Sequence, residues 1–173
     1  GMSVVGVDPS AVAIDTVRRR ARREELSLET YCGGVFDYPT QPPGRFGGVL
    51  CFGLLQLLPA PEIPRLVARF NSWLRPGGLL LLTAWTIDDP SYALACRWPR
   101  VDGANADEAI TPRSFRNPDG EIRTYLPLGG GSALFAADDW LVRDCWEGLG
   151  EEHRHGKGPW ERHGELRLVA VSR

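Results

Sequence analysis

The sequence predicts an α/β fold, a Rossmann-like and mostly parallel sheet with helices on both faces and a C-terminal antiparallel hairpin. First, apolar runs of strand length alternate with helical patterns up to residue 85, as in strand-helix-strand units. Second, the run LLLLTAW at 79–85 is continuously apolar, as expected for a strand covered on both faces. Third, two strand-like stretches in the last third are joined by a polar segment, which favours an antiparallel pair.

The composition fits a single domain over residues 1–173, since 43% of the residues are hydrophobic and 24% are charged. Twenty Lys and Arg stand against 22 Asp and Glu, and this balance does not indicate a partner such as nucleic acid or a membrane surface. Four widely spaced cysteines without a C-x-x-C pair predict reduced thiols, and no signal peptide is recognisable. We therefore expect a cytoplasmic protein whose partner is a small molecule.

The N-terminal stretch VVGVD at 4–8 has the β-branched residues of a buried strand, and Asp8 stands at its tip. Ser10 is a plausible N-cap for an amphipathic helix that runs through RRRARREE, and we expect that arginine run to be a solvated face rather than a phosphate site. LSLETYC at 26–32 predicts a second strand. A strand, an acidic residue at its tip and a helix are typical of the second strand of a nucleotide-binding sheet.

The middle of the chain predicts a loop at 39–48, a buried strand at 49–52 and a helix over 60–74 that RPGG ends before the strand at 79–85. Residues 87–119 are rich in Pro, Asp, Asn and Arg and predict a lid or substrate loop. In the last third we expect strands at EIRTYL, CWEGLGEE and ELRLVAVS, a flexible turn at LGGGS and a short helix at AADDWLVRD.

The stretches VVGVDPSAVAID, VLCFGLLQLLP and WLRPGGLLLLTAW, with the closing hairpin, resemble the class I S-adenosylmethionine-dependent methyltransferases over nearly the whole chain. A helix that ends in LRPGG directly before an apolar strand is typical of that family. The stretch GEEHR at 150–154 is similar to the Gly-Glu-x-His-Arg stretch of the tellurite-resistance and related small-molecule methyltransferases. The resemblance implies S-adenosylmethionine as the cofactor and a small methyl acceptor such as a thiol or a chalcogen oxyanion.

The resemblance also shows what the sequence lacks. In this family the first strand ends in a Gly-x-Gly-x-Gly turn, and no such motif occurs in these residues. We therefore expect Val4–Asp8 to match the family's second strand, in a chain truncated at its N-terminus. Loss of the first strand leaves backbone groups unpaired at the centre of the fold. Another chain, a rearranged sheet or a segment outside this sequence would fill the gap, and a homodimer that completes the sheet is one such arrangement.

The resemblance implies a cofactor site at the ends of three strands. Asp8 is expected to accept hydrogen bonds from the ribose hydroxyls, and the alternative is that it only caps the helix. Two glycines depart from the family's pattern, because Gly34 and Gly47 stand where an acidic residue is usual, and Asp37 is a candidate substitute for the former. The complete set of expected cofactor-binding residues is Asp8, Pro9, Ser10, Gly34, Val35, Phe36, Phe52, Gly53 and Leu54.

For the methyl acceptor we expect a pocket lined by Gln56, Trp85 and Trp98, with core packing as the alternative for both tryptophans. By resemblance, His153 would take a proton from the acceptor and Arg154 would hold an anionic substrate. We expect no metal, because the histidines lie in a polar hairpin without an obvious ligand spacing. A catalytically inactive methyltransferase-like binding or assembly protein is the main alternative function. A nicotinamide-dependent oxidoreductase is disfavoured by LRPGG and by the antiparallel ending.

Overall fold

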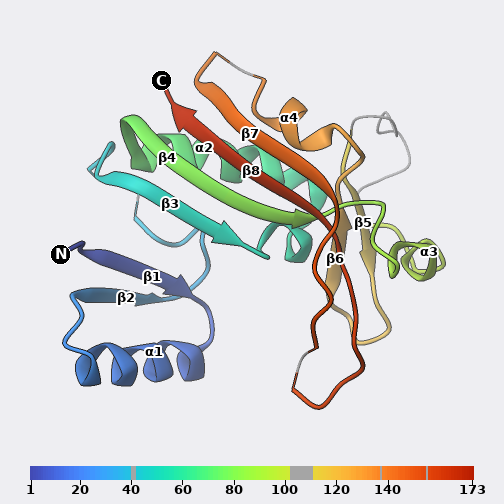
Figure 1. Ribbon diagram of the computed structural model, residues 1–173, viewed down its shortest axis with the longest axis horizontal. Coiled ribbons are helices and arrows are strands. Elements are labelled where there is room, and N and C mark those ends of the chain that lie inside the picture. Colours follow the sequence, from blue (N-terminus) through green and yellow to red (C-terminus); the bar gives the residue numbers. More distant parts are fainter. Residues whose placement is uncertain (40–41, 102–110, 137, 155) are drawn as a thin grey trace. The chain divides into compact units, whose positions relative to one another are not determined.

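A computed structural model describes residues 1–39, 42–101, 111–136, 138–154 and 156–173. The chain divides into two compact units, Gly1–Gln41 and Pro42–Arg173, and each is described by itself. Figure 1 shows their strands and helices in chain order.

The N-terminal unit consists of strand β1 (Val4–Asp8), helix α1 (Ala11–Arg23) and strand β2 (Leu28–Cys32). The two strands pair in parallel, in a register that runs from Val4 opposite Leu28 to Asp8 opposite Cys32. Helix α1 begins where the Ser10 hydroxyl accepts a hydrogen bond from the Ala13 N–H at 3.2 Å. It buries Ile14 and Ala21, while its arginines are exposed. The expected strand, capped helix and second strand are therefore confirmed.

The C-terminal unit is built on a mixed four-stranded sheet in the order β3-β4-β8-β7. Its strands are β3 (Phe46–Phe52), β4 (Leu74–Trp85), β7 (Trp140–Leu149) and β8 (Gly164–Ser172). β3 and β4 are parallel, and β8 runs antiparallel to both β4 and β7. This arrangement confirms the expected antiparallel ending on a parallel pair.

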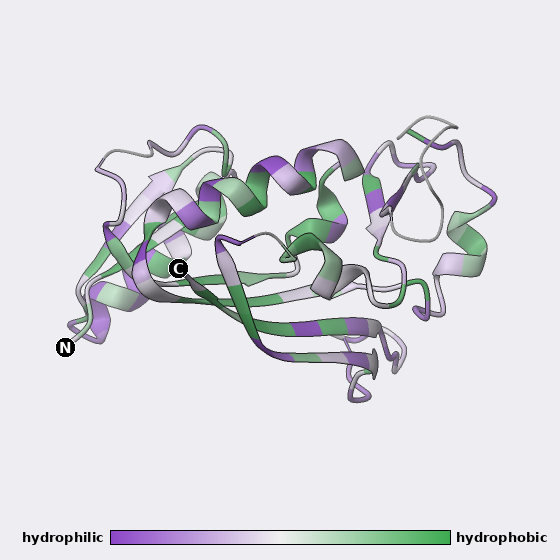
Figure 2. Ribbon diagram, turned by 90° about the horizontal axis from the view of Figure 1, so that it is seen from above, coloured by the Kyte–Doolittle hydropathy of each residue, from purple (hydrophilic) through white to green (hydrophobic). Residues whose placement is uncertain are grey.

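Helix α2 (Ile63–Trp73) follows two short 3-10 helices, η1 (Leu55–Leu57) and η2 (Ala60–Glu62). The helix packs against β4, and the Ser172 hydroxyl of β8 donates to Asn71 Oδ1 at 2.6 Å. Figure 2 shows hydrophobic residues along the strands that this packing buries. Among the residues the structure describes, no helix has the length and apolar character that crossing a membrane requires.

The two faces of this sheet differ. We call one the covered face, where side chains are at most 2% exposed: Leu80, Leu82, Ala84, Leu166, Leu168 and Ala170. We call the other the open face, where Leu50 is 68%, Phe52 61% and Leu79 43% exposed. On the open face Leu50 lies opposite Leu81, which in turn lies opposite Val169. Apolar side chains therefore continue across three strands on this face, and several of them are exposed in the described residues.

The expected single sheet with helices on both faces is thus found only in part. β1 pairs with β2 alone and β3 with β4 alone in the described residues, so β1 and β3 each have an edge without a strand partner. The fold is α/β with a mixed sheet and few helices, and it does not contain one complete Rossmann sheet.

Two expectations for the last third are wrong. The stretch expected as a helix forms the start of β7, because Trp140 and Val142 pair with Ser172 and Ala170 of β8. The glycine-rich stretch expected as a turn contributes helix α4 (Gly130–Leu134). A Cβ on Gly131 would lie 2.5 Å from Leu166 Cδ1, so this glycine allows the short helix to approach the sheet.

The region expected as a lid contains regular structure in its described part. Helix α3 (Tyr92–Ala95) and strand β5 (Arg113–Arg116) fall within it, and β5 pairs with β6 (Ile122–Tyr125) as an antiparallel ribbon. Residues 102–110 lie outside the described residues. The helix and ribbon enclose a small second core made of Ala95, Phe115 and Tyr125, against which Trp85, Ile87, Tyr92 and Trp98 pack.

Candidate active site

A cavity of about 290 Å³ lies where β4 ends and β8 begins. It is lined by Gln56, Thr83, Ala84, Trp85, His153, His163 and Glu165. Thr83 and Trp85 are on the open face near the carboxyl end of β4, and Gln56 comes from η1 just after β3. The carboxyl ends of parallel strands are where α/β sheets bind ligands, so the position of this cavity favours a functional site.

Asp89 fixes the imidazole of His163 at the cavity wall. His163 Nδ1 lies 2.8 Å from Asp89 Oδ2, and the Asp89 side chain is only 1% exposed. The Gly164 N–H also donates to Oδ2, at 3.1 Å, while the N–H and hydroxyl of Ser91 both donate to Oδ1. A Cβ on Gly164 would lie 2.2 Å from the Asp89 backbone nitrogen, so glycine is required for this approach.

Two stacked aromatic rings pack against the imidazole of His163. Trp85 stacks on His163 with ring centroids 4.7 Å apart, and Tyr125 stacks on Trp85 at 5.9 Å. The Tyr125 hydroxyl lies 2.9 Å from Ser91 Oγ, and burial raises the pKa of Tyr125, which keeps the phenol neutral at physiological pH. One wall of the cavity is therefore a packed aromatic stack tied to Asp89 through Ser91.

His153 lines the cavity, and Glu161 lies opposite it in the hairpin. Their backbones pair, with the His153 N–H donating to the Glu161 carbonyl at 2.9 Å and the reverse bond at 2.8 Å. The ring of His153 lies 5.2 Å from that of His163, and its Nδ1 lies 3.0 Å from the Glu151 carbonyl oxygen. Arg154 is exposed, with its guanidinium 5.4 Å from the centroid of the Trp160 ring.

The end of β3 contributes a sharp turn and a buried amide. Gly53 has a φ of +65°, and its N–H lies 3.1 Å from Thr83 Oγ1, which accepts its hydrogen bond. A Cβ on Gly53 would lie 3.1 Å from Gln56 Nε2. Gln56 is 9% exposed, and its Oε1 has no hydrogen-bond partner among the described residues. A buried acceptor without a donor favours a ligand that supplies one.

In the N-terminal unit, Asp8 is half-buried at the end of β1, and its Oδ1 accepts the Ser10 N–H at 2.7 Å. Asp8 thus shapes the start of α1, and no second hydrogen bond to its carboxylate is present in the part of the chain that the structure describes. Gly34 begins a turn that ends at Asp37, whose Oδ2 accepts the Gly34 N–H at 3.1 Å. Asp37 is therefore engaged with its own turn.

The expected acceptor residues are only partly brought together. Gln56, Trp85 and His153 line one cavity, whereas Trp98 packs against the small second core and Arg154 is not part of the cavity wall. Of the expected cofactor residues, Phe52, Gly53 and Leu54 connect β3 to η1, with Phe52 61% exposed. Pro9, Ser10, Val35 and Phe36 lie in the turns that follow β1 and β2.

Sequence reasoning set His163 aside as a residue of a surface hairpin, and it missed Asp89 and Glu161. The sequence offered two signals for these residues: His163 directly precedes Gly164 at the start of the last strand, and Asp88 and Asp89 precede Pro90.

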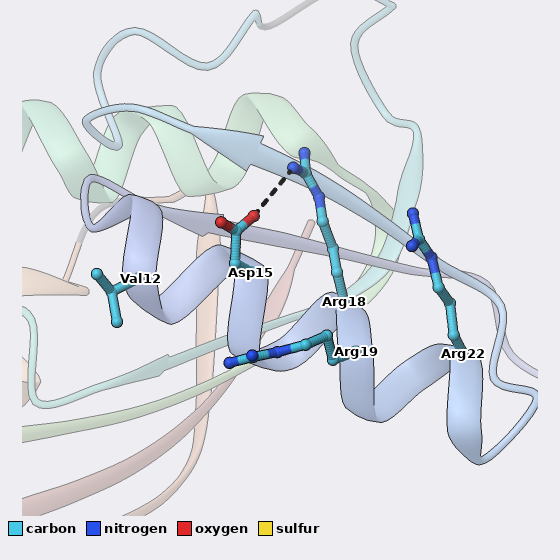
Figure 3. Close-up of a pocket in the computed structure, with 5 residues that line it drawn as sticks. All are labelled: Val12, Asp15, Arg18, Arg19 and Arg22. Carbon is cyan, nitrogen blue, oxygen red and sulfur yellow. Dashed lines mark ion pairs between the residues drawn. The ribbon is translucent and has the colours of Figure 1, made fainter.

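A second hollow, of about 360 Å³, lies on α1 and is lined by Val12 and by the charged residues drawn in Figure 3. Its arginines diverge, and only Asp15 and Arg18 pair there, at 3.7 Å, which agrees with the solvated face expected from the sequence.

Residues 1–78 match the family described as "Methyltransferase domain". Among curated proteins, the chain is 28% identical over 119 residues to the ubiquinone biosynthesis O-methyltransferase of Rhodopseudomonas palustris, covering 65% of this chain and 45% of that protein. It is 29% identical over 132 residues to the protein of the same name from Bradyrhizobium sp., covering 73% and 48%. The chain thus spans less than half the length of these two relatives.

Solved structures share the fold. TehB from Haemophilus influenzae superposes with a TM-score of 0.69 at 14% identity, over 100% of this chain and 51% of that one. A SAM-dependent methyltransferase from Methanosarcina mazei gives a TM-score of 0.70 at 16% identity, over 98% and 82%. An N1-methyltransferase from Burkholderia thailandensis, solved with S-adenosylhomocysteine bound, gives 0.61 at 14% identity, over 98% and 71%. Residues 1–78 of the chain are thus similar to a methyltransferase domain, and the fold of the chain is that of the S-adenosylmethionine-dependent methyltransferases named here.

Proposed function

We propose that this protein transfers a methyl group from S-adenosylmethionine to a small nucleophilic acceptor bound in the cavity beside Trp85 and His163. The observation that carries the proposal is the cavity itself. It lies at the carboxyl end of β4 in a methyltransferase-family fold, with an aromatic wall and a buried Gln56 oxygen that lacks a donor.

S-adenosylmethionine would supply an electrophilic methyl group on a sulfonium. In the N-terminal unit the residue that fits it is Asp8, because one carboxylate oxygen orders the turn into α1 and the other has the acceptor chemistry that a ribose diol needs. In the C-terminal unit, Gly53 lets the backbone turn sharply at the end of β3.

The chain's own residues would mainly position the acceptor. The face of Trp85 suits the desolvated apolar part of a small acceptor, and Gln56 Oε1 would accept a hydrogen bond from a thiol S–H or from a protonated oxygen of an oxyanion. The hydrogen bond to Asp89 holds the imidazole of His163 in one orientation, so this side of the cavity keeps a fixed shape. Positioning of this kind lowers a barrier by roughly 7 to 11 kcal/mol when the reacting atoms are held in line.

The acceptor class we propose is a small thiol or chalcogen oxyanion. A soft nucleophile of this kind ionises or reacts without strong general-base help. This fits a cavity in which Trp85 stacks on His163 and the buried Gln56 amide supplies a hydrogen-bond acceptor.

The test is transfer of label from [methyl-³H]S-adenosylmethionine to a panel containing a small thiol, selenite and a catechol. We expect labelled product from the thiol or selenite, and at least about tenfold slower transfer by Trp85→Ala, since a buried aromatic contact is lost. Trp160→Ala is the matched control, because Trp160 is 62% exposed and does not line the cavity.

Equal rates for Trp85→Ala and Trp160→Ala would contradict the assignment of the acceptor cavity. Failure to label any acceptor, in a folded chain that binds S-adenosylhomocysteine, would favour the inactive binding protein instead. Gln56→Met, of similar volume, provides a second variant in case Trp85→Ala does not fold.

A further inference from the structure

We propose that His153, Glu161 and His163 bind a divalent transition-metal ion of the Zn²⁺ class at the edge of the cavity. The proposal rests on side-chain geometry in the C-terminal unit and does not depend on methyl transfer. It departs from the expectation, drawn from the sequence, that the histidines of this hairpin bind no metal.

The hairpin brings the three ligands together from two strands. His153 lies opposite Glu161 through the pair of backbone hydrogen bonds described above. His163 follows Glu161 by two residues, which puts both side chains on one side of an extended chain. The ligand atoms of all three lie within 4.8 Å of one another, and the three residues are half-buried.

Both imidazoles are held by their Nδ1 atoms. The partner of His163 Nδ1 is the Asp89 carboxylate at 2.8 Å, and the partner of His153 Nδ1 is the Glu151 carbonyl at 3.0 Å. A carbonyl can only accept, so Nδ1 of His153 must be the donor, and the neutral ring then carries its lone pair on Nε2. Histidines that bind metals usually donate their other N–H to a carboxylate or a backbone carbonyl in this way.

The donor set selects the class of ion. Two imidazoles and one carboxylate suit Zn²⁺ and the similar Co²⁺, whereas Mg²⁺ and Ca²⁺ prefer oxygen ligands alone. Tetrahedral ligands about 2.0–2.2 Å from Zn²⁺ are about 3.3–3.6 Å apart, so ligand atoms that lie within 4.8 Å of one another need to approach by no more than about 1.5 Å. Rotation of half-buried side chains supplies movements of that size.

Three protein ligands leave a fourth position open, as in zinc sites that bind substrate or water. His153 and His163 also line the cavity with Gln56 and Trp85, so that position would face the same space. A thiolate or oxyanion bound there would complete the coordination of the ion.

The test uses the full chain and two metals. Co²⁺ is titrated with visible spectroscopy, and Zn²⁺ is titrated by calorimetry in a buffer that does not chelate. We expect one ion per chain, d–d bands without the near-ultraviolet charge transfer of thiolate ligands, and at least about tenfold weaker binding by His153→Ala and by Glu161→Gln. Glu152→Gln is the matched control, because Glu152 is an exposed carboxylate of the same hairpin outside the proposed set.

Several results would overturn the proposal. These are no binding at one ion per chain, equal binding by Glu161→Gln and the wild type, or thiolate bands, which would assign the ion to Cys32, Cys51, Cys96 or Cys145. Circular dichroism of each variant confirms that a lost signal does not come from unfolding. His153 and Glu161 lie in a partly exposed hairpin, so their variants are expected to fold.

Discussion

The two faces of the four-stranded sheet differ more than its sequence suggests. Leu82 on the covered face is 1% exposed, whereas Leu50 on the neighbouring strand, on the open face, is 68% exposed. Both belong to continuously apolar runs, and such runs predict strands with helices on both sides. An apolar run therefore predicts a strand but does not predict which of its faces is covered. Burial of the side chains on the covered face contributes most of the hydrophobic free energy that stabilises this unit.

The largest expected effect comes from shortening one leucine on each face. Leu82→Ala leaves a cavity against α2 and should lower the free energy of unfolding by about 2–5 kcal/mol. Leu50→Ala should change it by no more than about 0.5 kcal/mol, because its side chain is already exposed. Urea unfolding followed by tryptophan fluorescence measures both. Equal losses would mean that something covers the open face in solution.

A smaller effect is expected where α4 presses on the covered face. Gly131→Ala places a Cβ 2.5 Å from Leu166 Cδ1, and overpacking of this kind costs roughly 1–3 kcal/mol. The same unfolding experiment measures it. A neutral or stabilising result would show that α4 can move away from Leu166 without loss, and that the covered face is less tightly packed than described.

Thiol reactivity compares a buried position of the four-stranded sheet with exposed positions elsewhere in the chain, without perturbing stability. Burial raises the pKa of Cys51 to about 12, so at pH 8 its thiolate fraction is on the order of 10⁻⁴. Cys32, Cys96 and Cys145 are exposed. We expect iodoacetamide to alkylate these three thiols first and Cys51 only after unfolding, as read by peptide mass spectrometry. Rapid labelling of Cys51 in the folded chain would show that its surroundings on β3 open readily.

The smallest expected effect concerns dye binding to the open face. Exposed apolar side chains of this density bind anilinonaphthalene sulfonate, and Leu50→Ser with Phe52→Ser should reduce its fluorescence. The unfolding free energy should remain nearly unchanged. Unaltered fluorescence in the double variant would place the dye elsewhere.

Much of the fold follows from local sequence patterns. The strand at Val4–Asp8, the Ser10 cap and the helix ending before β4 are each determined by neighbouring residues, and the structure confirms them. The expected helix at AADDWLVRD failed because pairing of Trp140 with Ser172 of β8 outweighed a local pattern. Strand β5 was missed because its short stretch has no clear period without its partner β6.

Some residues of the candidate site could be predicted from the sequence, and others could be found only from the tertiary structure. Resemblance pointed to Gln56, Trp85 and His153, which line one cavity. The hydrogen bond between Asp89 and His163 joins residues 74 positions apart, and the pairing of β4 with β8 brings them together. Glu161 became a candidate ligand because the hairpin pairs it with His153, and the spacing of residues in the sequence does not reveal that pairing.

The proposed methyl transfer requires a nucleotide site that includes Asp8. It is tested most directly by calorimetric titration of S-adenosylhomocysteine into the wild type, Asp8→Asn and the surface control Asp15→Asn. Loss of charged hydrogen bonds to ribose should weaken binding by about tenfold or more in Asp8→Asn, while Asp15→Asn binds like the wild type. A folded wild type that takes up no ligand, or an Asp8→Asn variant that binds equally well, would contradict the account.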